Sequence, residues 1–151
     1  MAQSIMLDKD YMEKLEVSTT LKFNALAFTC GVFDIDCFDR VRIPIFKYMF
    51  TQFFGKDYKT NEFMKIGTIR NNKLENFPPV FLNTCYGDFV KKQVYSFYEE
   101  CKKRNVTVEL KVIEKKRINN LAHVYSVLFP EYEESIETTE ALINFFNKYM
   151  V

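Results

Sequence analysis

Residues 77–113, FPPVFLNTCYGDFVKKQVYSFYEECKKRNVTVELKVI, have the clearest pattern of secondary structure in the sequence. The two prolines of this stretch favour extended backbone and precede an apolar run, so we expect a strand over 79–85. Residues 89–104 carry apolar side chains at helical spacing. Residues 106–113 alternate β-branched or apolar residues with polar ones, which is typical of a strand. A strand, a helix and a strand in this order predict parallel strands joined by a right-handed crossover.

The same pattern extends to both sides of this stretch. Upstream, ALAFTC within 22–33 is nearly continuously apolar and ends at a glycine, which predicts a strand over 24–30 that is buried on both faces. Downstream, a polar loop leads to an amphipathic helix over 133–149, whose apolar side chains include Ile136, Ile143, Phe146 and Tyr149. Residues 4–16 predict a further helix. The fold class is therefore α/β, with about three parallel strands and flanking helices.

Residues 39–72 differ from the rest of the chain because they show no strand pattern. RIPIFKYMFTQFFG (42–55) predicts a helix with a proline in its first turn and a glycine at its end, and 61–72 predicts another short helix. This aromatic insertion between two strands either packs on the main body or forms a lid over a pocket. We expect the whole chain, 1–151, to form one domain.

Composition excludes several classes of protein. The chain has 151 residues, of which 48% are hydrophobic and 27% charged, so it is expected to fold. Its net charge of +1 gives no overall field for nucleic acid or an anionic membrane. No apolar run reaches the roughly 18 residues of a membrane span, and the first residues do not resemble a signal peptide. We therefore expect a cytoplasmic protein that binds no nucleic acid and spans no membrane.

Glycine and cysteine usage restricts the chemistry further. The four glycines form none of the motifs GxGxxG, GxxxxGK or GxSxG. The four cysteines form no CxxC pair, and the single histidine lies far beyond the last of them, so we expect buried thiols and no zinc site. No cofactor or metal is predicted.

Two residues are the candidates for chemistry. Asp88 follows the strand expected at 79–85, and His123 lies in the loop after the strand expected at 106–113. Because the carboxyl ends of adjacent parallel strands lie at one edge of a sheet, the two side chains are expected to meet there. A carboxylate that accepts a hydrogen bond from an imidazole fixes its tautomer, as in a hydrolase triad. The alternative roles are ordinary ones: a helix cap for the aspartate and a solvated histidine.

Residues 77–146 resemble the C-terminal part of α/β-hydrolases of the esterase/lipase kind, especially the hormone-sensitive-lipase-like and acetyl-esterase branch. In that family a strand entered by two prolines leads to a turn with the triad acid, matched here by Asp88. A strand of the form VxVELxV, matched by 106–112, precedes a loop with the triad histidine, matched by His123 and followed by Val and Tyr. Residues 25–36 are similar to the strand after the nucleophile helix, and 39–72 falls where the family has part of its cap.

The nucleophile of that family is missing. The resemblance implies a serine carboxylesterase, but none of the five serines lies in a GxSxG elbow and no HGG-type oxyanion loop is present. Met1-Ala2-Gln3 look like the part of the nucleophile helix just after the elbow. The sequence therefore predicts a partial hydrolase that supplies Asp88 and His123, acts on a small acyl ester only when completed by an N-terminal half, and does not hydrolyse esters alone.

Two alternatives remain beside this interpretation. Cys85, three residues before Asp88, could replace the serine as nucleophile, although a thiol at the end of a core strand is usually inert. The chain could also be a non-catalytic, self-associating or binding module that keeps the hydrolase scaffold. Loss of the strands beyond 24–30 would leave an uncovered edge, so we expect homo-oligomers in contact through that strand or through the aromatic segment 42–54.

Overall fold

The computed structural model describes residues 16, 22–35, 44–61, 68, 74, 77–114 and 121–150. The chain divides into two compact units, one formed by residues 1–21 and 33–73 and the other by residues 22–32 and 74–151. That 1–151 forms one domain stays a prediction. The helices predicted at 4–16 and 61–72 lie outside the described residues, apart from single positions.

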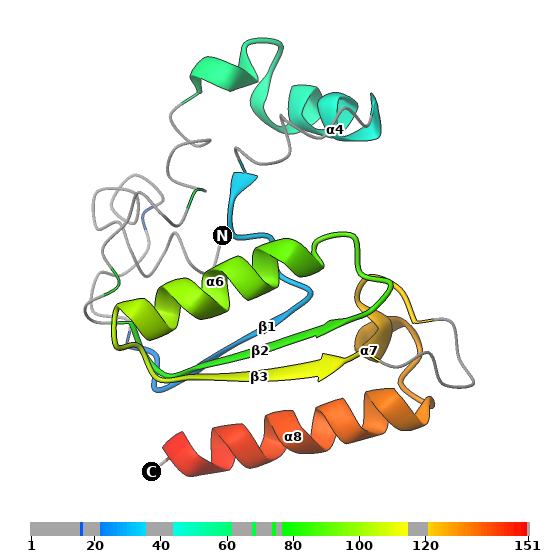
Figure 1. Cartoon of the computed structure of the whole chain (residues 1–151). Coiled ribbons are helices and arrows are strands. Elements are labelled where there is room, and N and C mark those ends of the chain that lie inside the picture. The colour runs from blue at the N-terminus through cyan, green and yellow to red at the C-terminus, as the bar shows by residue number, and fades with distance from the viewer. Residues whose placement is uncertain are drawn as a thin grey trace. The chain divides into compact units, whose positions relative to one another are not determined.

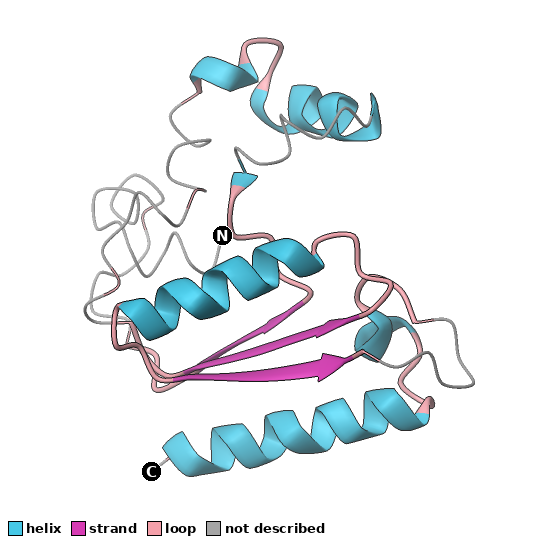
Figure 2. Ribbon diagram, in the orientation of Figure 1, coloured by secondary structure: helices cyan, strands magenta, loops and turns pink. Residues whose placement is uncertain are grey.

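A three-stranded parallel sheet forms the centre of the second unit (Figures 1 and 2). Its strands are β1 (Leu26–Thr29), β2 (Val80–Cys85) and β3 (Val108–Ile113), in the spatial order β1-β2-β3. The three strands predicted from the sequence are confirmed, with somewhat shorter bounds. The prediction that the first strand is buried on both faces is wrong, because β1 lies at the edge of the described sheet and only Leu26 of its four residues is buried. All six residues of β2 are buried, as expected for a central strand that is covered on both faces.

The register places the carboxyl ends of the strands side by side. Thr29 of β1 pairs with Asn83 of β2, and Asn83 pairs with Lys111 of β3. The chain segments that leave the three strands therefore start at the same edge of the sheet, where parallel sheets bind their ligands.

Helices cover the two faces of this sheet (Figure 2). On one face lies α6 (Lys91–Lys103), whose Phe97 meets Phe28 of β1 edge to face at a centroid distance of 6.2 Å. On the other lies α8 (Glu133–Tyr149), whose Phe145 packs against Phe81 of β2 at 5.5 Å. Side chains of successive strand residues point to opposite faces, so β2 contributes to both layers of the core.

The apolar face predicted for the first of these helices is confirmed. Val94, Phe97 and Cys101 of α6 are buried, and they follow one another at spacings of three and four residues. Lys102 and Lys103 occupy the last turn, where positive charge interacts favourably with the helix dipole.

The bounds predicted for the last helix are confirmed, but the face predicted for it is wrong in part: Phe146 and Tyr149 are half-buried and pack against Phe145, whereas the two isoleucines are not buried. Ile136 and Ile143 are exposed to 48% and 53%, whereas the buried residues of α8 are Glu134, Ser135, Thr138 and Phe145. Polar residues can occupy a buried helix face when their hydrogen bonds are satisfied within the protein. Hydrophobic periodicity cannot identify such a face, because three of the four residues that turn inward are polar.

The first unit contains α4 (Pro44–Phe54) and a short 3-10 helix, η1 (Tyr58–Thr60). The predicted helix at 42–55 is confirmed: Pro44 is its first residue, and Gly55 follows its end with a φ of 85°, in the left-handed region that glycine tolerates best. The ring of Phe50 lies 5.6 Å from that of Tyr58, so η1 packs back on α4. Whether this segment is a lid stays a prediction.

Within the ranges that the structure describes, no helix combines the length and the apolar character that crossing a bilayer requires.

From the burial of Cys101 we predict how the free energy of unfolding changes at alkaline pH. Desolvation raises the pKa of this thiol from 9.0 to about 12, with a smaller contribution from the negative charge of Glu100. The folded state therefore keeps a proton that the unfolded chain loses above pH 9. The contribution of this thiol to the free energy of unfolding is complete below pH 9. It is lost as the pH rises toward 12, by at most about 1.4 kcal/mol for each pH unit.

We expect the free energy of unfolding of Cys101→Ala to fall less steeply between pH 9 and 11 than that of the wild-type chain. Urea unfolding at a series of pH values measures both slopes. The difference between the two proteins should be constant below pH 8, which serves as the internal control. Parallel curves above pH 9 would contradict the assignment.

Candidate active site

The site lies at the carboxyl edge of the sheet, where three chain segments converge. Cys30 follows β1, Asp88 follows β2 and His123 lies in the loop after β3. Nδ1 of His123 lies 2.8 Å from Oδ1 of Asp88, which is a hydrogen-bond distance. Since a carboxylate accepts hydrogen bonds and does not donate them, Nδ1 carries a proton, and in the neutral form of the ring Nε2 is the nitrogen with the free lone pair. The expected meeting of the two side chains is confirmed.

The two partners differ in their exposure to solvent. The side chain of Asp88 is fully buried, whereas that of His123 is 30% exposed. In such an arrangement the buried carboxylate holds one ring nitrogen of the imidazole, and the other ring nitrogen is left for a substrate.

Further hydrogen bonds fix the carboxylate of Asp88. The hydroxyl of Thr84 donates to Oδ2 at 2.7 Å, and the backbone N–H of Val90 donates to Oδ1 at 3.0 Å. The second bond joins a side chain to the backbone two residues later, as in an Asx turn, and it leads the chain into α6. The structural role that the sequence suggested for this aspartate and its contact with His123 therefore exist together.

The turn after β2 also holds the loop that carries the histidine. The hydroxyl of Tyr86 accepts a hydrogen bond from the backbone N–H of Leu121 at 3.2 Å. The thiol of Cys85 donates to the carbonyl of Ala122 at 3.3 Å. Gly87 lies directly against the carbonyl of Leu121, where a Cβ atom would overlap with it. Four successive residues, 85–88, thus contact three successive residues, 121–123.

Beyond His123 the chain turns into α7 (Tyr125–Leu128), a short helix within the segment that the sequence suggested was all loop. Val124, between the histidine and this helix, has a φ of 53°. A valine rarely adopts this left-handed conformation, and it persists only where surrounding contacts impose it.

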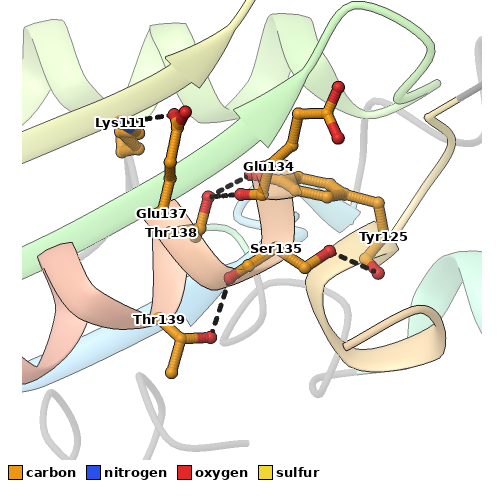
Figure 3. A network of polar contacts seen from close by, with 7 residues as sticks. All are labelled: Lys111, Tyr125, Glu134, Ser135, Glu137, Thr138 and Thr139. Carbon is orange, nitrogen blue, oxygen red and sulfur yellow. Dashed lines mark hydrogen bonds and ion pairs between the residues drawn. The ribbon is translucent and has the colours of Figure 1, made fainter. Parts of the chain in front are cut away.

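Those contacts include a buried polar network between α7 and α8 (Figure 3). The hydroxyl of Thr138 donates to the carbonyl of Glu134 at 2.8 Å, so the hydroxyl of Tyr125, 2.6 Å away, is the donor to Thr138. The hydroxyl of Ser135 donates to the carbonyl of Tyr125 at 3.4 Å. Burial raises the pKa of Tyr125 to about 12, so its hydroxyl keeps its proton. The network anchors the chain two residues after His123.

The exposed ring of Phe89 covers part of the imidazole. Its centroid lies 4.4 Å from that of His123, and the residue is 59% exposed. The aromatic ring restricts the rotation of the imidazole and adds an apolar surface beside it.

Cys30 is the member of the site that sequence reasoning missed. Its sulfur, a carboxylate oxygen of Asp88 and a ring nitrogen of His123 all lie within 4.8 Å of one another. Burial raises the pKa of this thiol to about 12, and its hydrogen bond to Asp88 acts in the same direction. The sequence does contain a signal for Cys30, because this residue directly follows the first strand. A residue in that place lies at the same edge of the sheet as Asp88 and His123.

Cys85 does not have the properties of an activated nucleophile. Burial raises its pKa, whereas a nucleophilic cysteine needs a lowered one. Its thiol proton is donated to the carbonyl of Ala122. The interpretation of this cysteine as an inert core thiol is therefore favoured.

The close approach at Gly87 predicts that a single methyl group would disturb the site. In Gly87→Ala the new Cβ displaces Leu121 and, with it, the loop of His123. We expect a loss of about 1–3 kcal/mol in the free energy of unfolding, the usual cost of overpacking. In the proton NMR spectrum, the far-downfield signal of the Nδ1–H of His123 should disappear. Gly55→Ala is the control for the NMR signal: its Cβ meets nothing within 4 Å, and the signal should stay unchanged although alanine at a φ of 85° costs stability as well.

The Tyr125–Thr138 hydrogen bond can be measured with a double-mutant cycle. Tyr125→Phe should cost about 1 kcal/mol of stability, because the hydroxyl of Thr138 loses its donor in a buried place. Combining it with Thr138→Val removes both partners, so the double variant should lose less than the sum of the single losses. Chemical denaturation of the four proteins gives the coupling energy. Strict additivity would mean that this bond does not stabilise the fold.

Comparisons with known proteins show which folds the chain resembles. No protein-family model and no curated protein matches the chain. Several solved structures do. Esterase B from Lactobacillus rhamnosis has a TM-score of 0.76 at 18% identity, over 97% of this chain and 47% of the esterase. A fungal esterase from Rhizomucor miehei has a TM-score of 0.58 at 13% identity, over 97% of this chain and 46% of the other. An esterase from Pyrobaculum calidifontis has a TM-score of 0.51 at 12% identity, over 92% and 46%.

The chain thus spans a little under half the length of the esterases that it resembles. Structural similarity at such low sequence identity establishes a shared fold and nothing more. The parallel sheet with a helix on each face is part of that fold. The order of the strands, with an aspartate after the second and a histidine after the third, is consistent with the C-terminal half. The chain therefore has the fold of one half of an α/β-hydrolase of the esterase/lipase kind.

Proposed function

We propose that this chain supplies the acid and the base of an esterase whose nucleophile comes from outside these 151 residues. Asp88 is the triad acid and His123 the triad base. The observation that carries the proposal is the 2.8 Å contact between Nδ1 of His123 and Oδ1 of Asp88, at the carboxyl edge of a parallel sheet. The likeness of the fold to esterases supports the same reaction class.

The chemistry assigned to each residue follows from this geometry. Nε2 of His123 takes the proton of the attacking hydroxyl and returns it to the leaving alcohol. Asp88 holds the ring in the tautomer that leaves Nε2 unprotonated, and it stabilises the imidazolium that forms. The hydrogen bonds from Thr84 and Val90 keep the carboxylate in place during this transfer.

The substrate we propose is a small ester with an apolar acyl group. Phe89 provides an exposed apolar surface beside the imidazole. No cofactor or metal takes part in this reaction.

Without the nucleophile the chain alone should not hydrolyse esters. A missing serine removes the acyl-enzyme, and a missing oxyanion donor removes about 3–4 kcal/mol of transition-state stabilisation. The alternative function is a non-catalytic binding module that keeps the scaffold, and the ordered Asp88–His123 pair argues against it because such a module does not need this contact.

We further propose that the chain self-associates and acts in the cytoplasm. Within the sheet of described residues, β1 has a hydrogen-bonded neighbour on one side only, so its other edge is a possible contact between copies.

The first experiment uses the chain as it is. We expect hydrolysis of p-nitrophenyl acetate by the wild-type protein to equal that of His123→Ala. Turnover well above that of this variant would contradict the proposal. The state of the dyad is read separately by proton NMR, since His123 is the single histidine of the chain. Its Nδ1–H signal should be lost in Asp88→Asn and kept in Asp57→Asn, which changes an aspartate of the other unit.

The second experiment supplies the missing half. A chimera joins the N-terminal half of the Lactobacillus esterase to this chain, and hydrolysis of p-nitrophenyl butyrate is measured. We expect activity that falls by roughly a thousandfold or more in Asp88→Asn and His123→Ala. A folded chimera whose turnover does not depend on His123 would refute the assignment.

A further inference from the structure

We propose that Cys30, Asp88 and His123 form a binding site for a thiophilic divalent cation such as Zn²⁺. The sulfur, the carboxylate oxygen and the ring nitrogen that they offer all lie within 4.8 Å of one another. In tetrahedral zinc sites the metal lies about 2.0–2.3 Å from each donor, so the donors are about 3.3–3.7 Å apart. Small shifts of side chains are enough to reach this geometry.

The chemistry of the three donors selects the metal. Thiolate, imidazole and carboxylate together suit Zn²⁺, Co²⁺ or Cd²⁺, whereas Mg²⁺ and Ca²⁺ prefer a shell made only of oxygen. Three protein ligands leave a fourth position for water. His123 is partly exposed, which gives an ion access to the otherwise buried donors.

Groups around the donors have the character of an outer coordination shell. The backbone of Val124 lowers the pKa of the Cys30 thiol and so acts against the burial that raises it, as a group that favours a bound thiolate would. Cys30 and Val124 both have left-handed backbone, with φ values of 50° and 53°. The hydroxyl of Thr84 orients the carboxylate of Asp88 from the other side. These contacts are a second observation, separate from the distances among the three donors, and they support the same site.

Binding of the metal would change the hydrogen bonds of the site. The ion replaces the thiol proton of Cys30 and the Nδ1 proton of His123. The thiol proton of Cys30 goes to the solvent. The proton that leaves Nδ1 is carried on Nε2, so a neutral imidazole stays neutral and one proton is released for each ion bound. A ring held in this way no longer offers Nε2 as a base, so the metal and the proposed acid–base role exclude each other. Metal binding itself needs neither a nucleophile nor an ester.

The test titrates the reduced, metal-free chain with Co²⁺. We expect near-ultraviolet absorption typical of a cobalt–thiolate bond and visible bands of a tetrahedral site, both removed by one equivalent of Zn²⁺. Cys30→Ser and His123→Gln should weaken binding of Zn²⁺ by more than about 100-fold, because each loses a ligand. Circular dichroism checks that each variant folds.

Two variants serve as matched controls. Cys101→Ser changes a buried thiol of α6 that is not part of the cluster, and Cys37→Ser changes a cysteine outside the described residues. Both should bind the metal as the wild-type chain does. Absorption that survives in Cys30→Ser or disappears in Cys37→Ser would overturn the proposal.

A measurement on the unchanged protein covers the case in which a variant does not fold. Because the chain has one histidine, its imidazole nitrogen signals belong to His123 alone. Zn²⁺ should shift the Nδ1 resonance and abolish the far-downfield Nδ1–H proton signal in a one-to-one ratio. Unchanged imidazole signals at excess Zn²⁺ would refute the site, and they would leave the acid–base proposal unaffected.

Discussion

The parallel register of the three strands is the constraint on which the site depends. Thr29, Asn83 and Lys111 lie side by side, so the segments that leave β1, β2 and β3 start from one edge. An antiparallel neighbour would send one of these segments to the opposite edge. The hydrogen bond between Asp88 and His123 joins residues 35 positions apart, and it exists because the register brings their loops together.

The turn of residues 85–88 acts as one unit with the loop of residues 121–123. A thiol, a phenol, a glycine and a carboxylate each make one contact with this loop. The carboxylate–imidazole contact is thus the last of four, and the other three contribute to placing the ring. On the far side of the histidine, Tyr125 is held by Thr138 and Ser135 of α8. The imidazole is fixed from both directions along the chain, which is the arrangement expected for a preorganised site.

The residues at this edge of the sheet suit two kinds of chemistry that exclude each other. Asp88 accepts hydrogen bonds from the imidazole and from the thiol of Cys30, and it is shared between them. With protons in place, the arrangement resembles the acid–base half of a hydrolase. With a cation in place of those protons, the same three atoms become ligands. Which state prevails depends on the supply of metal and on whether a nucleophile is present beside Nε2.

Much of the fold was predictable because its signals are local. The alternation in VTVELKVI, the apolar run after the two prolines and the spacing of Val94, Phe97 and Cys101 each depend on neighbours in sequence. The face of α8 was not predictable in this way. Its buried positions include Glu134, Ser135 and Thr138, and their partners come from the backbone and from α7. The short helix α7 was missed for a related reason, since it is entered through the left-handed backbone of Val124, a conformation that a valine in the sequence does not suggest.

The class of fold, the order of the strands and the pairing of Asp88 with His123 follow from alternation, turn residues and strand-to-loop order, which are properties of the chain before it folds. That Cys30 joins the pair, that Gly87 lies against Leu121 and that polar residues of α8 face the core is seen only in the folded molecule. Each of these depends on the approach of segments far apart in sequence. Such approaches are set by packing and by buried hydrogen bonds, and no local pattern records them.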